Sequence, residues 1–156
     1  MMFEKMRRND RELREASELE AILQAGEYGV LATNGLHGYP YAVPLSYVYL
    51  NGKLYFHGAP EGSKLNNIRA DERVSFCVVG HTCILPAKFS TQYESVIVFG
   101  RAGEAGAEEK QAALTALVAK YSPEYREQGQ SYIGRVLDKT LVLRLDIEHM
   151  TGKARR

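Results

Sequence analysis

The chain reads LYFHGAPEGSKLNNI from residue 54 to residue 68. An apolar, aromatic run ends at His57 and is followed by glycine and proline, which is typical of a strand that enters a turn. A helical pattern then begins near Ser63 and Lys64. Because the first N–H groups of a helix lack partners and lie at the positive end of its dipole, such a start suits a phosphate. We therefore expect a strand, a turn and a helix that bind a phosphorylated ligand. The alternative is a plain structural corner with a solvated lysine.

Strand-like runs surround this segment and are separated by turn signals. Asn51-Gly52, for example, is a strong signal for a two-residue hairpin. The six expected strands span residues 28–33, 41–50, 53–57, 73–79, 93–104 and 140–148. Six strands joined mostly by hairpins, with few helices, predict a mainly β fold with flanking α-helices, in which an antiparallel sheet closes into a small barrel.

Helical patterns flank and interrupt these strands. Expected helices span residues 9–24, 63–70, 107–120 and 125–136, and Asn9 or Asp10 would cap the first. No repeat or low-complexity linker is present, so we expect one domain over residues 1–156. Residues 1–8 and 150–156 are expected to be flexible or dimer-contacting tails.

The composition argues against several classes of protein. A chain of 156 residues with 45% hydrophobic residues can bury one core, and its formal charge of +1 lacks the concentrated basic surface that nucleic-acid binding needs. No apolar run is long enough to span a membrane, and the charged first 26 residues lack the apolar segment of a secretory signal. Two cysteines in such a chain are expected to be free thiols. We expect a cytoplasmic protein with neither nucleic acid nor membrane as a partner.

Motifs for unaided catalysis are missing. The segment that starts at Gly58 is one residue too short for a P-loop, and its serine precedes its lysine. Neither a G-x-S-x-G elbow nor a G-x-G-x-x-G fingerprint occurs. Cys77, His81 and Cys83 are metal-ligand types without a second cluster, so no metal site is expected. These absences favour a bound cofactor that supplies the chemistry.

The run Tyr41-Ala42-Val43-Pro44 carries a proline inside an expected strand. Since proline donates no N–H to a sheet, it belongs at an edge, a bulge or a gap that faces a ligand. The free backbone groups of such an edge can contact the rim of a flat heterocycle such as an isoalloxazine. Together with the phosphate-binding helix, this strand predicts a site shaped for a nucleotide.

Four stretches and the closing Thr151-Gly152-Lys153 occur in an order that is typical of a known family. The stretches are YGVLAT (28–33), GYPYAVP (38–44), LYFHGAPEGSK (54–64) and YESVIVFG (93–100). On these motifs the chain resembles the FMN-binding split barrels of the pyridoxamine 5'-phosphate oxidase-like superfamily. Within that superfamily it is similar to the nitroimidazole-resistance family.

This resemblance implies a six-stranded antiparallel split β-barrel and a homodimer with FMN at the subunit interface. It implies that the flavin ring is lined by the backbone of Tyr41, Ala42, Val43 and Pro44. It further implies these roles: Phe56 and His57 beside the ring and ribityl chain, Ser63, Lys64 and Asn67 at the phosphate, and Tyr93, Glu94 and Ser95 from the second subunit. His57 is the candidate catalytic residue, because its pKa range suits proton delivery. A histidine that closes the turn is the alternative.

One departure from the family narrows the expected activity. Tyr41 and Ser63 stand at flavin-side positions where the name-giving oxidase has arginines, and its C-terminal substrate pattern is absent. We therefore expect a reductase of nitroaromatic or related electron-poor compounds, with a transient nicotinamide donor, rather than a vitamin B6 oxidase. Weak flavin affinity or a different ligand stays open. The rival hypotheses are a flavin-binding or redox-sensing module without turnover, and the same fold binding haem or deazaflavin.

Overall fold

A computed structural model of the chain describes residues 3–156. Its main helices are α1 (Ala16–Ala25), α2 (Ser63–Ala70), α3 (Ala107–Tyr121) and α4 (Arg126–Val136). Its strands are β1 (Glu12–Leu13), β2 (Gly29–Asn34), β3 (Pro40–Leu45), β4 (Val48–Leu50), β5 (Lys53–Gly58), β6 (Arg73–Leu85), β7 (Ser90–Glu104) and β8 (Leu141–Arg155). The mainly β architecture with flanking helices is therefore confirmed. None of the described helices is long and apolar enough to cross a bilayer.

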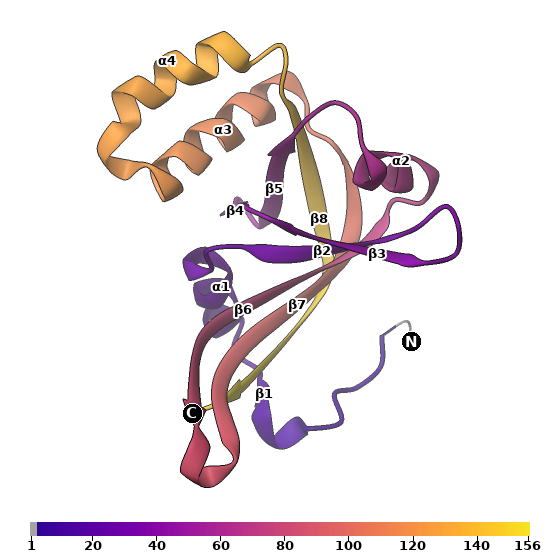
Figure 1. Cartoon of the computed structure of the whole chain (residues 1–156), viewed down its shortest axis with the longest axis vertical. Helices are drawn as coiled ribbons and strands as arrows, with labels where there is room; N and C mark the ends of the chain where they lie inside the picture. Colours follow the sequence, from indigo (N-terminus) through magenta and orange to yellow (C-terminus); the bar gives the residue numbers. More distant parts are fainter. Residues whose placement is uncertain (1–2) are drawn as a thin grey trace.

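The strands form one antiparallel sheet whose two edges are joined by a very short link. The order is β3-β2-β6-β7-β8-β5-β4, with β1 added beside β8. Strands β3 and β4 lie at opposite edges, yet only Ser46 and Tyr47 separate them in the chain. The sheet must therefore curl until its edges approach each other, and this curl makes the split barrel (Figure 1).

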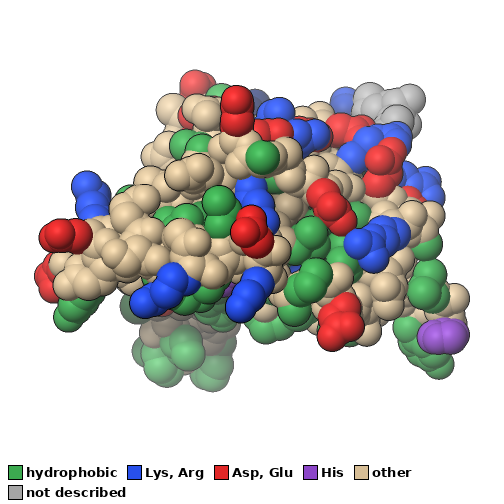
Figure 2. Space-filling view, turned by 90° about the horizontal axis from the view of Figure 1, so that it is seen from above, with side chains coloured by type: hydrophobic (Ala, Val, Ile, Leu, Met, Phe, Trp, Pro, Cys, Tyr) green, Lys and Arg blue, Asp and Glu red, His purple; other side chains and the backbone are tan. Residues whose placement is uncertain are grey.

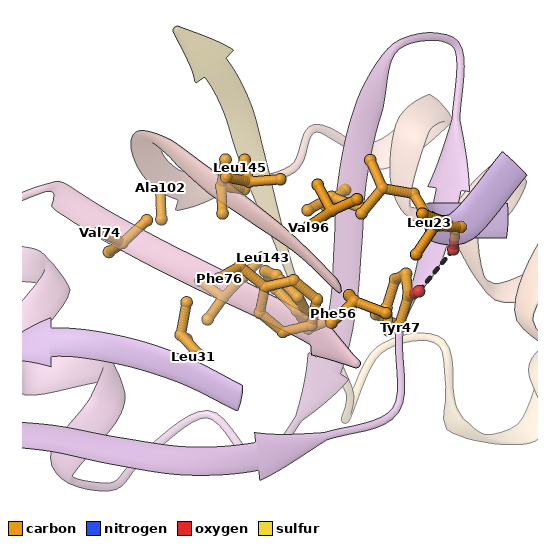
Figure 3. Packing of buried hydrophobic residues seen from close by; sticks show 14 of the residues in the cluster. Leu23, Leu31, Tyr47, Phe56, Val74, Phe76, Val96, Ala102, Leu143 and Leu145 are labelled. Carbon is orange, nitrogen blue, oxygen red and sulfur yellow. Dashed lines mark hydrogen bonds between the residues drawn. The ribbon is translucent and has the colours of Figure 1, made fainter. Parts of the chain in front are cut away.

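Tyr47 lies where this barrel comes together. Its side chain is fully buried, and its hydroxyl donates a hydrogen bond of 2.5 Å to the Leu23 carbonyl of α1 (Figure 3). Its ring meets Phe76 edge-on, and Phe76 in turn packs against Phe56, with 5.0 Å between ring centroids in each pair. Edge-to-face aromatic pairs stabilise a core beyond the area that they bury. The core thus ties α1 to the inside of the curled sheet.

Two boundaries differ from the sequence prediction, and both have a tertiary cause. The expected helix over residues 9–24 begins at Ala16, and Asn9 and Asp10 do not cap it; a short 3-10 turn and β1 precede it. Leu13 is buried where β1 pairs with Gly152, so sheet pairing overrides the helical pattern. The expected strand 41–50 is broken, because the Tyr47 N–H donates to the Tyr121 hydroxyl of α3 instead of to a strand. These changes make eight strands out of the expected six.

Strands β6 and β7 extend beyond the barrel as a hairpin arm, which we define as residues 79–95. It projects away from the end that carries α3 and α4 (Figure 1). Phe89 at its tip is 98% exposed, and Ile84 is 73% exposed. The sequence predicted a flexible or dimer-contacting tail at residues 150–156; β8 continues to Arg155 and pairs with the base of this arm, so most of this segment is ordered strand. Residues 1–2 of the predicted N-terminal tail lie outside the described residues.

Candidate functional site

The N-terminus of α2 is open to a ligand. Gly62 precedes the helix with a φ of +134°, a conformation that favours glycine, and no side chain caps the helix. The first backbone bond into the helix is donated by Asn66 to the Gly62 carbonyl, at 3.1 Å. The N–H groups of Ser63, Lys64 and Leu65 therefore lack partners within the helix, and Ser63 is exposed beside them.

The Lys64 ammonium lies over the end of β5. A Cβ atom placed on Gly58 would lie 3.2 Å from Lys64 Nζ, so Gly58 leaves the space that the lysine occupies. Lys64 takes part in none of the ion pairs found within residues 3–156. Its charge is therefore available to an anion that meets the open end of α2.

His57 is next to this lysine, at the penultimate position of β5. Partial burial lowers the pKa of His57, and the nearby Lys64 charge lowers it further. The imidazole is therefore neutral at neutral pH. A neutral imidazole has one N–H donor and one acceptor, so it can form hydrogen bonds to a ring or a polar substituent.

Strand β3 is an edge of the sheet, which is one of the positions that its proline allows. Pro44 pairs with Val30 of β2, and no strand of the described chain lies on the other side of β3. Tyr41, Ala42 and Pro44 are exposed, and Val43 is half-buried. Backbone groups along this outer side are available to a ligand, as the sequence-based hypothesis requires.

Helix α2 is fixed to β2, the strand beside β3. The Asn67 side-chain amide donates to the Thr33 hydroxyl at 2.9 Å, and both residues are buried. The Asn34 amide donates to Asp71 just after the helix, at 3.0 Å. Thr33 pairs with Tyr41, so these bonds set the distance between the helix and the edge strand. The Asn67 side chain points inward and does not join Ser63 and Lys64.

Other residues of the predicted site lie away from this corner. Phe56 is 1% exposed and belongs to the core, so its side chain shapes the wall behind the site rather than its surface. Tyr93, Glu94 and Ser95 pair with the last residues of β8, whereas Gly58 pairs with its first. Within one chain they are thus at opposite ends of a 15-residue strand.

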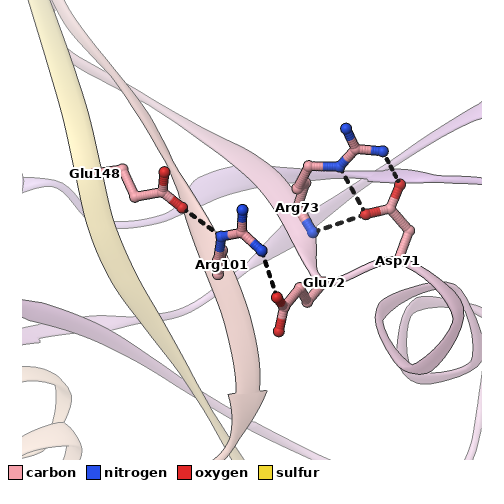
Figure 4. A network of polar contacts seen from close by, with 5 residues as sticks. All are labelled: Asp71, Glu72, Arg73, Arg101 and Glu148. Carbon is pink, nitrogen blue, oxygen red and sulfur yellow. Dashed lines mark hydrogen bonds and ion pairs between the residues drawn. The ribbon is translucent and has the colours of Figure 1, made fainter. Parts of the chain in front are cut away.

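A neighbouring cleft of about 440 Å³ lies beside the C-terminal end of α2. Its charged side chains already have partners: Arg69 pairs with Glu104, Arg73 with Asp71 and Arg101 with Glu72. Arg101 also pairs with Glu148, outside the lining (Figure 4). Such paired arginines do not offer a free charge to a phosphate. On the face shown in Figure 2, acidic and basic side chains are likewise interspersed.

Two residues near the site have no signal in the sequence. Lys120 Nζ donates to the Tyr47 carbonyl at 2.9 Å and lies 3.8 Å from the centroid of the Tyr47 ring. The Tyr121 hydroxyl donates to the Glu27 carbonyl at 2.5 Å. Both residues pin α3 to the link between the sheet edges. Since they end an ordinary amphipathic helix, only the packing reveals this role.

A family model confirms the resemblance seen in the motifs. The model for pyridoxamine 5'-phosphate oxidase matches residues 15–154, which is most of the chain. The chain belongs to the pyridoxamine 5'-phosphate oxidase family. No curated protein matches this sequence.

Solved structures share the fold of this oxidase-family chain. An FAD-binding protein of Mesorhizobium loti is 28% identical, over 94% of this chain and 98% of that one, with a TM-score of 0.70. A candidate 5-nitroimidazole antibiotic resistance protein of Bacteroides thetaiotaomicron is 22% identical, over 92% and 86%, with a TM-score of 0.74. The conserved hypothetical protein Rv2991 of Mycobacterium tuberculosis is 19% identical, over 97% and 91%, with a TM-score of 0.83. The split-barrel fold is thus shared along nearly the whole of this chain.

Proposed function

We propose that this protein binds FMN and reduces nitroaromatic or related small electron-poor compounds, with electrons from a nicotinamide donor. The observation that carries the proposal is the Lys64 ammonium beside the uncapped end of α2, in the space left by Gly58. A phosphate placed there would meet a full charge, free N–H groups and the helix dipole together.

The remaining groups of this corner fit the rest of a flavin. The open side of β3, from Tyr41 to Pro44, suits the hydrogen-bonding rim of the ring, and α2 is fixed to the adjacent strand by Asn67. The presence of an FAD-binding protein among the solved relatives supports a flavin, and the resemblance of the motifs to FMN-binding split barrels favours FMN within that class.

A bound flavin would supply the transfer of electrons from nicotinamide to a nitro group. The protein's own side chains would position the flavin and the substrate and supply charge and hydrogen bonds to them. Lys64 and Ser63 would hold the phosphate, while His57 would donate a hydrogen bond to the substrate from a neutral imidazole. Burial lowers the pKa of His57 and the Lys64 charge lowers it further, so phosphate binding that neutralises Lys64 would remove only the second part of this shift.

The proposal includes a homodimer with the flavin between subunits. Tyr93, Glu94 and Ser95 lie at the far end of β8 from Lys64, so within this proposal they reach a flavin through a second copy. The arm that carries them also exposes Val79, Ile84 and Phe89. Exposed apolar side chains on one projecting element are typical of a surface that is covered in an assembly.

We also propose that the protein works in the cytoplasm. Cys77 and Cys83 are free thiols, and burial raises the pKa of Cys77. Unpaired cysteines are usual in reducing compartments.

The test is the absorption spectrum of the purified protein. We expect a flavin spectrum that bleaches with NADH or NADPH and recovers on addition of 2-methyl-5-nitroimidazole. Lys64→Ala should weaken FMN binding about tenfold or more, because hydrogen bonds to charged groups are the stronger ones. Lys139→Ala, an exposed lysine beyond α4, is the control. A Lys64→Ala variant with unchanged FMN affinity would remove the phosphate assignment.

The same spectrum separates the rival hypotheses. A flavin that bleaches chemically, but never passes electrons to nitro compounds, would favour a binding or sensing module. Haem and deazaflavin each have a different absorption spectrum from FMN. Colourless protein that cannot be reconstituted with FMN would overturn the proposal.

A further inference from the structure

A cleft of about 580 Å³ opens beside His57, between the barrel end and the hairpin of α3 and α4. Ser46, His57 and Thr140 line it from the barrel, and the two helices and their connection supply the other walls. Its volume is in the range of pockets that hold small molecules. The α3–α4 hairpin covers this end of the barrel (Figure 1).

The cleft has a fixed apolar floor. Leu114, Leu117 and Ile133 line it and are buried in a second core that joins the helices to β4, β5 and β8. A Cβ atom on Gly129 would collide with the Val118 side chain, so the two helices are in close contact there. Tyr121, another lining residue, is held by its hydrogen bond to Glu27. The shape is therefore formed without a ligand.

Aromatic rings form the rim. Tyr125 is 59% exposed and Tyr132 is 52% exposed, and both line the cleft. Tyrosines present a flat apolar face and a polar tip, which suits a planar ring with polar substituents. Large exposed aromatics around an apolar floor indicate a binding surface rather than ordinary packing.

The charge of the lining is one-sided. Arg135 is the sole Asp, Glu, Lys or Arg among the described residues that line the cleft. It takes part in none of the ion pairs formed within residues 3–156. An unpaired cation in a lining that contains no Asp or Glu favours neutral or negative ligands and disfavours cations.

We propose that this cleft is the substrate chamber, and that it selects planar aromatic compounds that are neutral or negatively charged. The assignment rests on the proposed function, because His57 lines the cleft and also lies next to Lys64, which would hold the FMN phosphate. A ring on the apolar floor has one edge at His57 and its negative substituent toward Arg135.

The test is isothermal titration calorimetry of the full chain at pH 7, with and without FMN. The probes are 4-nitrobenzoate, 4-nitrobenzyl alcohol and 4-nitrobenzylamine, which are negative, neutral and positive. We expect the anion and the alcohol to bind more tightly than the cation. Arg135→Glu should weaken 4-nitrobenzoate about fivefold, the scale of one partly exposed ion pair, and should tighten 4-nitrobenzylamine. Lys139→Glu makes the same charge change near the same helix end, outside the cleft, and should leave both affinities unchanged.

A blocking variant tests the location without altering charge. Gln128 is exposed and lines the cleft, so Gln128→Trp should remove measurable binding of all three probes. Gln111→Trp, exposed on α3 away from the cleft, is its control. Unchanged binding in Gln128→Trp, or equal affinity for anion and cation in the wild type, would overturn the proposal.

Two further outcomes separate this proposal from the flavin assignment and from a protein contact. If the chain fails to bind FMN but binds 4-nitrobenzoate in a way that depends on Arg135, the proposed function fails and the cleft stands. If FMN binds and the probes do not, the chamber fails alone. If Gln128→Trp converts a dimer into a monomer in light scattering, the cleft is a subunit contact and the chamber is overturned.

Discussion

The two ends of strand β8 lie beside different parts of the chain. The first residue of β8 pairs with Gly58, beside Lys64, and its last residue pairs with Tyr93, at the base of the arm. The first end, which we call the ligand end, offers an unpaired cation, free helix N–H groups and an open edge strand. The second, the arm end, offers exposed apolar side chains. Polar groups without partners suit a small ligand, whereas exposed apolar groups suit another protein surface. One chain therefore holds the two halves of the proposed interface site at opposite ends.

The largest expected effect tests whether the barrel core and the arm differ in stability. Phe76 is fully buried and Phe89 is 98% exposed, although a single hairpin carries both. Phe76→Ala should lower the free energy of unfolding by about 4 kcal/mol, measured by urea denaturation, because it leaves a cavity in the core. Phe89→Ala, its control, should change the monomer's stability by less than about 0.5 kcal/mol. A comparable loss in both variants would show that the arm tip is packed.

The second prediction tests the arm as an assembly surface. Replacing Ile84 and Phe89 together by Asp should weaken dimerisation by at least about 2 kcal/mol, the scale of an interface hot spot. Light scattering across a dilution series measures it. FMN affinity should fall in parallel, because Tyr93 to Ser95 of a second copy would be lost from the site. A double variant that remains dimeric with full FMN affinity would separate the arm from the ligand end.

The third prediction concerns the space at the ligand end. Gly58→Val should weaken FMN about tenfold, since the new side chain displaces the Lys64 ammonium, which would lie only 3.2 Å from the added Cβ atom. Its effect should not add to that of Lys64→Ala, because both changes remove one interaction. Fluorescence titration of FMN measures both. Gly103→Val is the matched control in β7, where a Cβ atom meets nothing within 4 Å. Full additivity would contradict a shared role for Gly58 and Lys64.

The smallest expected effect is a pH dependence at the link between the sheet edges. Burial lowers the pKa of Lys120 to about 8, whereas the unfolded lysine titrates near 10.5. Between these values the unfolded chain binds more protons, so stability should rise with pH over this window, by about 1 kcal/mol after solvent screening. Above about pH 10 stability should fall, because burial raises the pKa of Tyr47 and, to about 12, that of Tyr55.

Urea denaturation at a series of pH values checks this profile. Lys120→Met should abolish the rise that begins near pH 8 and leave the fall above about pH 10. A rise that persists in Lys120→Met would assign it to another group.

Much of the fold was predictable, because its strands carry local signals. The hairpin at Asn51-Gly52 and the helix predicted over residues 107–120 follow from turn chemistry and hydrophobic periodicity. The proline rule allowed Pro44 an edge, a bulge or a gap that faces a ligand, and the edge is what the sheet shows. The length of β6 was not predictable, since His81 and Cys83 break its apolar pattern. His81 lies where the pairing register shifts, and the strand continues because pairing with β7 resumes at Thr82 and Cys83. The start of α1 was missed for the same reason, because β1 forms by pairing with β8.

The candidate site divides in the same way. His57, Ser63 and Lys64 are neighbours in the chain, so their grouping at one corner could be predicted. Asn67 is on the same short helix, but its side-chain amide donates a hydrogen bond to the Thr33 hydroxyl and so lies away from Ser63 and Lys64. The predicted place of Asn67 at the phosphate did not include this contact. The cleft beside His57 could not be predicted, because its walls come from segments that meet only in the folded chain.

Local signals were sufficient to predict the strand, turn and helix around Lys64, since glycine, proline and a helix start act over a few residues. The sequence also restricted Pro44 to an edge, a bulge or a gap that faces a ligand. Three relations emerge only in the folded chain. Ser46 and Tyr47 close the barrel, and Lys120 and Tyr121 hold this link. Tyr93 is remote from Lys64, because it pairs with the far end of β8. The physical reason is that these relations depend on the register of long strands and on packing between distant segments, which no local pattern encodes.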